Sequence, residues 1–148
     1  MEVLNYLLAL IISFSGLFVG MFLGRIAKEE LKQGKKYFIL LQHLLFSLVI
    51  FFILLIIDNI YLALTAVLVF IFSYKAELSS KIAYPLLGLF FYFSSASREM
   101  ILINSALTFL YGFPAGSLLK NKKDILFYSL FILIGIILFF LPLNLSYP

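Results

Sequence analysis

The sequence predicts an all-α integral membrane protein, a single transmembrane domain (residues 1–148) whose six membrane-spanning helices form three hairpins. Two observations predict this class. Of 148 residues, 64% are hydrophobic and only 12% are charged, whereas soluble domains carry about 45–50% apolar and about 25% charged residues. The apolar residues also gather in six stretches separated by short polar connections. These observations exclude an ordinary soluble domain, whose surface needs more charge, and a disordered chain, which needs low hydrophobicity.

The six apolar stretches comprise residues 4–23, 38–57, 60–74, 82–95, 101–119 and 125–143. A helix that crosses about 30 Å of hydrocarbon needs about 20 residues, and four of the stretches meet this length. The third and fourth, with 15 and 14 residues, span only if the lysines at their ends extend their side chains to the interface. Runs such as residues 51–57 are continuously apolar, which favours helices over the alternating strands of a membrane barrel.

The distribution of basic residues predicts the orientation in the cell membrane. Basic connections stay in the cytosol, and an even number of spans then places both termini outside. We therefore expect a multi-pass protein of the cell membrane, whose positive charge contacts membrane lipids and implies no nucleic-acid partner. Ten of the eleven Lys and Arg residues lie in the connections after the first, third and fifth stretches: Arg25, Lys28, Lys32, Lys35, Lys36, Lys75, Lys81, Lys120, Lys122 and Lys123.

The first connection is expected to have structure of its own. Residues 25–33 are good helix formers and should extend the first helix beyond the membrane, with Gly34 as its terminator. No basic residue precedes the first stretch, and no small-residue cleavage site follows it. The stretch therefore differs from a secretory signal, and we expect it to remain as a mature helix.

An offset of 92 residues aligns the first stretch with the fifth and predicts an internal repeat, descended from a duplicated helical hairpin. The small residues of each stretch step by three or four positions, so they share one helix face. The aligned pairs are Ser13 with Ser105, Gly16 with Thr108, Gly20 with Gly112, Gly24 with Gly116 and Lys28 with Lys120.

Gly16, Gly20 and Gly24 form a double glycine-xxx-glycine run, as in a glycine zipper. Small residues let another backbone approach closely, which is how membrane helices associate. The glycine face predicts a close helix crossing. Its partner is either a helix of the same chain, the fifth stretch with Gly112 and Gly116 among the candidates, or a second copy in a homo-oligomer.

Pro114 in the fifth stretch predicts a helix break. Proline removes one backbone hydrogen bond and clashes with the carbonyl of Leu110, so residues 111–116 are expected to kink or unwind. In transporters, interrupted helices often mark the substrate site. A kink that serves packing alone is the alternative.

Polar residues within the apolar stretches are the other functional candidates. His43 is suited to relay protons, or it is a neutral histidine bonded to a neighbouring helix. The polar residues of the first and fifth stretches either line a path with it or tie helices together. The candidate path comprises Ser13, His43, Asn104, Ser105 and Thr108.

Three charged residues are expected on the outer side: Asp58, Arg98 and Glu99. We expect them to be turn residues in contact with headgroups and water. The alternative is an outer gate or anion-recognition site around Arg98, the one arginine predicted to face outward.

The sequence disfavours enzymatic and cofactor chemistry. It has no cysteine and one histidine, so we expect neither a metal site nor a cofactor, and the catalytic motifs of phosphate loops, zinc proteases and serine hydrolases are missing. The first hypothesis is a small transporter or channel for a solute or ion, with a path along the first and fifth helices. The alternatives are a structural subunit of a larger membrane complex and, third, a lipid-modifying enzyme.

Overall fold

The computed structural model describes residues 3–55, 60–76, 78–119 and 121–141. The chain is 91% helical, and no strand occurs in these ranges, so the predicted all-α class is confirmed. The elements are α1 (Val3–Ile26), α2 (Lys28–Leu55), α3 (Ile60–Lys75), α4 (Ser80–Ser94), α5 (Arg98–Ser117), the 3-10 turn η1 (Lys122–Asp124) and α6 (Ile125–Phe140).

Three of the helices, α1, α2 and α5, are long and apolar enough to cross a membrane. They have 24, 28 and 20 residues, which corresponds to about 30–42 Å at about 1.5 Å per residue. The helices α3, α4 and α6 have 15 or 16 residues, or about 22–24 Å. The sequence expectation that the sixth stretch reaches residue 143 extends beyond α6, which ends at Phe140.

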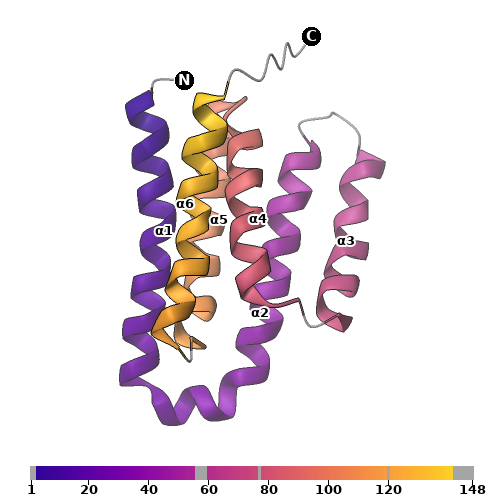
Figure 1. Ribbon diagram of the computed structural model, residues 1–148. Helices are drawn as coiled ribbons and strands as arrows, with labels where there is room; N and C mark the ends of the chain where they lie inside the picture. Colours follow the sequence, from indigo (N-terminus) through magenta and orange to yellow (C-terminus); the bar gives the residue numbers. More distant parts are fainter. Residues whose placement is uncertain (1–2, 56–59, 77, 120, 142–148) are drawn as a thin grey trace.

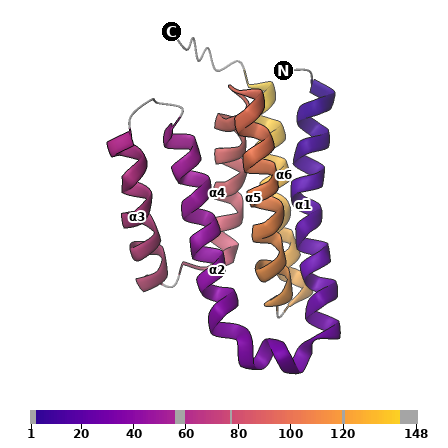
Figure 2. The same cartoon turned by 180° about the vertical axis from the view of Figure 1, so that it is seen from behind.

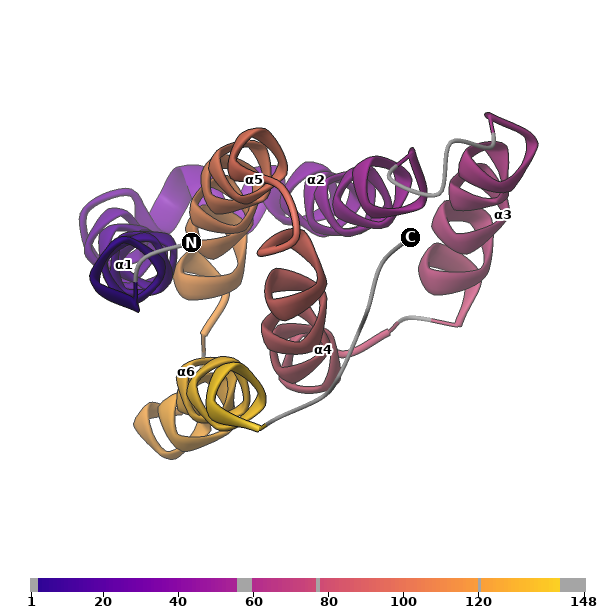
Figure 3. The ribbon, with the colours of Figure 1, turned by 90° about the horizontal axis from the view of Figure 1, so that it is seen from above.

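The helices form two layers (Figure 3). One layer contains α1, α5, α2 and α3 in that order, and the other contains α6 and α4. The most extensive contacts join α1 to α5, α4 to α6, α2 to α3 and α2 to α5. The core between the layers is rich in aromatic side chains. The hydroxyl of Tyr6 on α1 donates a hydrogen bond of 2.9 Å to the carbonyl of Gly135 on α6, which ties the two layers together.

Helices that follow one another in the chain run in opposite directions (Figure 1). The connections α1–α2, α3–α4 and α5–α6 lie at one end of the molecule, and the start of α1 and the last turn of α6 lie at the other. We call the first of these the basic end, because Arg25, Lys35, Lys75 and Lys81 lie in or next to these connections. Lys120 lies outside the described residues.

The helices joined at the basic end do not pack as the three hairpins expected from the sequence. Helix α5 lies between α1 and α2 (Figure 2), and α3 and α4, like α5 and α6, lie in different layers. The reason is that α1 and α5 both present glycines, which allow a closer approach than α1 and α2 can reach. Helix α2 packs instead on α3 and α5.

Gly34 does not terminate a helix, so that expectation is wrong. Helix α1 ends at Ile26, one residue interrupts it, and α2 then runs from Lys28 through Gly34. Backbone hydrogen bonds of 2.9 Å from Ala27 to Leu23 and from Leu31 to Ala27 keep the helical pattern across the junction. Glycine inside a helix costs only about 1 kcal/mol, which the good helix formers around it offset. The first turns of α2 lie across the basic end before the helix turns along the bundle (Figure 1).

Candidate functional site

The glycine faces of α1 and α5 meet in one closed contact, which we call the α1–α5 seam: Gly16, Gly20, Gly24, Gly112 and Gly116. A Cβ atom added at Gly16 would overlap the carbonyl oxygen of Phe109, and one at Gly24 would lie 2.8 Å from the carbonyl oxygen of Ser117. From the other side, a Cβ at Gly112 would lie 2.5 Å from the backbone nitrogen of Leu17. Since the two backbones touch along the seam, no solute passes between α1 and α5 at these positions.

Helix α5 continues through Pro114 to Ser117, so of the two expected outcomes, a kink or an unwound segment, the unwound segment is not present. Proline removes one backbone hydrogen bond, the one to the carbonyl of Leu110, and the bonds that follow it are kept. The carbonyl of Pro114 still accepts from the backbone N–H of Leu118 at 3.2 Å and from the hydroxyl of Ser117 at 3.1 Å. Pro114 is itself fully buried.

Three of the candidate path residues, Ser13, Ser105 and Thr108, are buried, and the two serines bond within their own helices. The hydroxyl of Ser13 donates to the carbonyl of Ala9 at 2.6 Å, and that of Ser105 donates to the carbonyl of Ile101 at 2.5 Å. Thr108 is 1% exposed. Both serine hydroxyls therefore donate their hydrogen bonds within their own helices.

Asn104 is fully buried on α5, and its amide nitrogen donates to the hydroxyl oxygen of Ser94 on α4. This bond joins two helices that are consecutive in the chain. The pair lies toward the end opposite the basic end, so Asn104 does not meet His43 in one site.

The described residues include two of the three charged residues that the sequence places on the outer side. Arg98 and Glu99 begin α5 and are exposed, and Asp58 lies outside the described residues. Arg98 lines a groove of about 350 Å³ between α1 and α5 whose other walls include Leu8, Ile12 and Leu102. The groove is mostly apolar.

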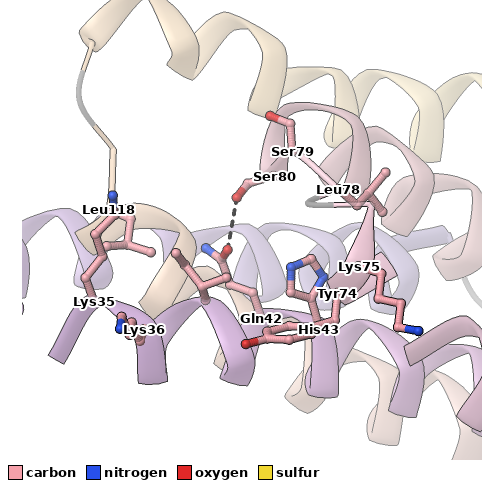
Figure 4. A pocket seen from close by; sticks show the side chains of 11 residues that line it. Lys35, Lys36, Gln42, His43, Tyr74, Lys75, Leu78, Ser79, Ser80 and Leu118 are labelled. Carbon is pink, nitrogen blue, oxygen red and sulfur yellow. Dashed lines mark hydrogen bonds between the residues drawn. The ribbon is translucent and has the colours of Figure 1, made fainter. Parts of the chain in front are cut away.

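A larger cavity opens at the basic end, with a volume of about 830 Å³. We call it the basic-end cavity. Its walls come from α2, from the end of α3 and the start of α4, and from Leu118 just after α5 (Figure 4). The lining residues are Lys35, Lys36, Ile39, Gln42, His43, Tyr74, Lys75, Leu78, Ser79, Ser80 and Leu118. The cavity thus combines residues from four segments of the chain.

Gln42 is a buried polar residue of the cavity wall. Its side chain is 6% exposed, and its Oε1 accepts a hydrogen bond of 3.2 Å from the hydroxyl of Ser80. Its Nε2 has no hydrogen-bond partner. A buried amide without a partner costs about 1–3 kcal/mol, so the cavity contains an unused hydrogen-bond donor.

His43 follows Gln42 and is 5% exposed. Its imidazole packs edge-on against the ring of Tyr74 from α3, with ring centroids 5.7 Å apart. His43 lies seven residues beyond Lys36 on the same helix, or about 10 Å deeper along its axis. The cavity therefore extends from the lysines at its rim to a buried histidine.

Positive charge dominates the cavity. Lys35, Lys36 and Lys75 line it and are exposed, and no described lining residue is acidic; Glu77, next to Leu78 in sequence, lies outside the described residues. Helix α4 begins at the cavity wall, where the Ser79 hydroxyl accepts from the backbone N–H of Lys81 at 3.4 Å as an N-cap. The positive end of the α4 dipole adds to the lysines.

Comparison with known proteins gives no relative. No family model matches the chain, and neither a characterised protein nor a solved structure shows significant similarity to it. In the described part of the chain, no group of three or more histidine and carboxylate side chains could hold a metal ion. The site is therefore interpreted from its own geometry.

Sequence reasoning identified His43 but missed its neighbours from other helices. Tyr74 and Lys75 end α3, and Ser79 and Ser80 begin α4. A pair of serines after a short polar connection predicts a helix start, and this pattern could have identified Ser79 and Ser80 as the start of α4. That this start faces Gln42 depends on long-range packing, which no local pattern contains.

Proposed function

We propose that the chain is a multi-pass protein of the cell membrane and a small transporter or channel, whose vestibule for a polar solute or ion is the basic-end cavity. The observation that carries this proposal is a polar cavity of about 830 Å³ that reaches the buried side chains of Gln42 and His43 in a chain that is 64% hydrophobic. Polar and ionisable groups at membrane depth are expensive and mark pathways.

The proposal moves the path from the first and fifth helices to α2, α3 and α4. The α1–α5 seam leaves no room for a solute, whereas the cavity has open volume. The basic end faces the cytosol in this proposal, because loops rich in Lys and Arg stay inside. The vestibule then opens to the cytosol.

The absence of cysteine from the chain allows a direct test of this orientation. Ser79→Cys lies at the cavity, and Ser97→Cys lies at the opposite end, before α5. A membrane-impermeant maleimide should label Ser97→Cys on intact cells and Ser79→Cys only in inside-out vesicles. Labelling of Ser79→Cys on intact cells would overturn the proposed orientation.

Transport itself is tested in proteoliposomes. Light scattering follows the re-swelling of liposomes after a hyperosmotic step in potassium chloride with valinomycin or in glycerol. Re-swelling should be faster with the protein than in protein-free liposomes for at least one of these solutes. His43→Leu should remove the difference, and Lys32→Gln, an exposed change outside the cavity, should keep it. Equal rates with and without protein for both solutes would count against a channel for these solutes.

A structural subunit is the second candidate, and one observation favours it. Helix α3 makes its main contact with α2 alone and exposes Val67, Leu68 and Phe72. In a membrane this face meets either lipid or a partner helix. Co-purification of one protein in constant ratio, lost on Phe72→Ala, would favour the subunit over the transporter.

A further inference from the structure

We propose that the basic-end cavity binds a phosphate ester, with the phosphate held by the lysines and Gln42 and the organic part held by the aliphatic wall. This inference rests on the proposed function only in that both use the same cavity. It names the ligand class, which the transport proposal leaves open.

The free N–H donor of Gln42 indicates that the ligand carries a negative charge. The hydroxyl of Ser80 already occupies Oε1 of Gln42, and the free group is Nε2, an N–H donor within a residue that is 6% exposed. A partner for it must be a hydrogen-bond acceptor. A cationic ligand offers no acceptor there and would meet three lysines. An anion satisfies both the amide and the charges.

The surrounding charges are arranged for an anion with several oxygens. Lys35 and Lys36 approach from α2 and Lys75 from the end of α3, and the first turn of α4 begins at the same cavity with its backbone N–H groups. Lysine acts as a point charge for phosphate, and a helix N-terminus favours negative charge. Donors that come from three elements suit a tetrahedral phosphate better than a single halide ion.

The remaining wall selects an ester over free phosphate. Ile39, Leu78 and Leu118 line the cavity beside the polar groups and offer an apolar surface. Inorganic phosphate has nothing to place there, and the volume of about 830 Å³ far exceeds its needs. A phosphate ester places its carbon part on this wall. The ester is either a soluble metabolite-sized monoester or the diester headgroup of a phospholipid, and both present negatively charged phosphate oxygens.

The test uses the full chain in a neutral detergent, so that it does not depend on transport. One arm measures binding of radiolabelled glycerol 3-phosphate by equilibrium dialysis. The other measures retention of phosphatidylglycerol, against phosphatidylcholine, by native mass spectrometry. Saturable binding of glycerol 3-phosphate supports a soluble ester, and selective retention of phosphatidylglycerol supports a lipid headgroup. Binding in neither arm overturns the inference.

Two double variants separate the site from general charge. Lys35→Gln with Lys75→Gln removes two charges at the cavity, and Lys32→Gln with Lys123→Gln removes two exposed charges at the same end that do not line it. We expect the first pair to weaken binding at least about tenfold and the second less than about twofold. Equal weakening by both pairs would show unspecific attraction and overturn the inference.

Gln42→Leu removes the free donor at nearly constant size. We expect about fivefold weaker binding at an unchanged helical circular dichroism spectrum. If this variant does not fold, the lysine pairs still decide the result. Binding of glycerol 3-phosphate without its uptake into liposomes, and without flux of either solute tested above, would leave the site standing and remove the transport proposal. Flux of glycerol without binding in either arm would do the reverse.

Discussion

The α1–α5 seam and the basic-end cavity are both places where small or polar residues interrupt an apolar chain, yet the first is closed and the second is open. In the seam, glycines on both helices repeat every four residues and face one another, so the backbones come into contact. At the cavity, Gln42 and His43 of α2 face the connection from α3 to α4 and the start of α4. Small residues close a gap only where two straight helix faces carry them in register.

The largest expected effect tests the closed side of this comparison. In Gly20→Leu, the new Cβ would overlap the carbonyl oxygen of Phe113 and lie 2.6 Å from that of Gly112. Since backbone cannot move aside as a side chain can, we expect a loss of at least about 3 kcal/mol in the free energy of unfolding. Thermal melting by circular dichroism in detergent, with size-exclusion chromatography, measures it.

Gly34→Leu is the matched control. A Cβ there would meet only Phe38, at 3.7 Å, which is ordinary contact, and leucine favours a helix over glycine by up to about 1 kcal/mol. We expect unchanged or slightly raised stability. Equal tolerance of leucine at positions 20 and 34 would contradict the closed seam.

The sequence predicts where the helices lie better than where they begin and end. Hydropathy located all six helices, but it placed the start of the second at residue 38, whereas α2 begins at Lys28. Hydropathy records the apolar character of a segment, and it does not detect a helical segment that is rich in Lys and Glu. The prediction of a helix end at Gly34 was wrong for a different reason, because glycine permits a helix end without requiring one.

The partners of each helix were harder to predict than the helices. The glycine run indicated a close crossing but left open which helix takes part, and the structure places α5 there. The basic residues indicated one common end. For the cavity, His43 was visible as a polar residue in an apolar stretch, but Ser80 and Tyr74 reach it only through the packing of α3 and α4 against α2.

A smaller effect is expected from the buried hydrogen-bonded pair Ser94 and Asn104, which joins α4 to α5. Ser94→Ala deprives Asn104 of its acceptor in a fully buried position. Interhelical hydrogen bonds of this kind contribute about 0.6–2 kcal/mol in membranes, so we expect a loss of about 1–2 kcal/mol. The double variant with Asn104→Leu should cost less than the sum of the two single changes. Strict additivity would show that the pair does not interact.

The ion pair beside the cavity should contribute less. The ammonium of Lys81 lies 2.9 Å from a carboxylate oxygen of Asp124, and the two side chains are 45% and 15% exposed. Partly exposed pairs contribute about 0–1 kcal/mol and are screened by salt. Lys81→Gln should therefore lower stability by about 0.5 kcal/mol at low salt and by almost nothing at 1 M salt. Lys123→Gln, exposed on η1, is the control; a loss in Lys81→Gln that persists at 1 M salt would mean that the pair is shielded from water.

The smallest effect on stability is expected where the cavity itself is filled, and this variant reports most directly on the open side of the comparison. The chain contains no tryptophan, so Ile39→Trp places a unique fluorophore on the cavity wall. The larger ring has open volume to occupy, and we expect a change in stability of less than about 0.5 kcal/mol, since no packed neighbour must move.

The same variant shows what fills the cavity. The Ile39→Trp emission should be quenched by acrylamide from water, because the cavity is lined by lysines and serines. Phe72→Trp, at a side chain that is 73% exposed on α3, should instead be quenched by brominated lipid. If both fluorophores responded to lipid alone, the basic-end cavity would be a lipid-filled groove, and the contrast with the closed seam would be one of packing rather than of access to water.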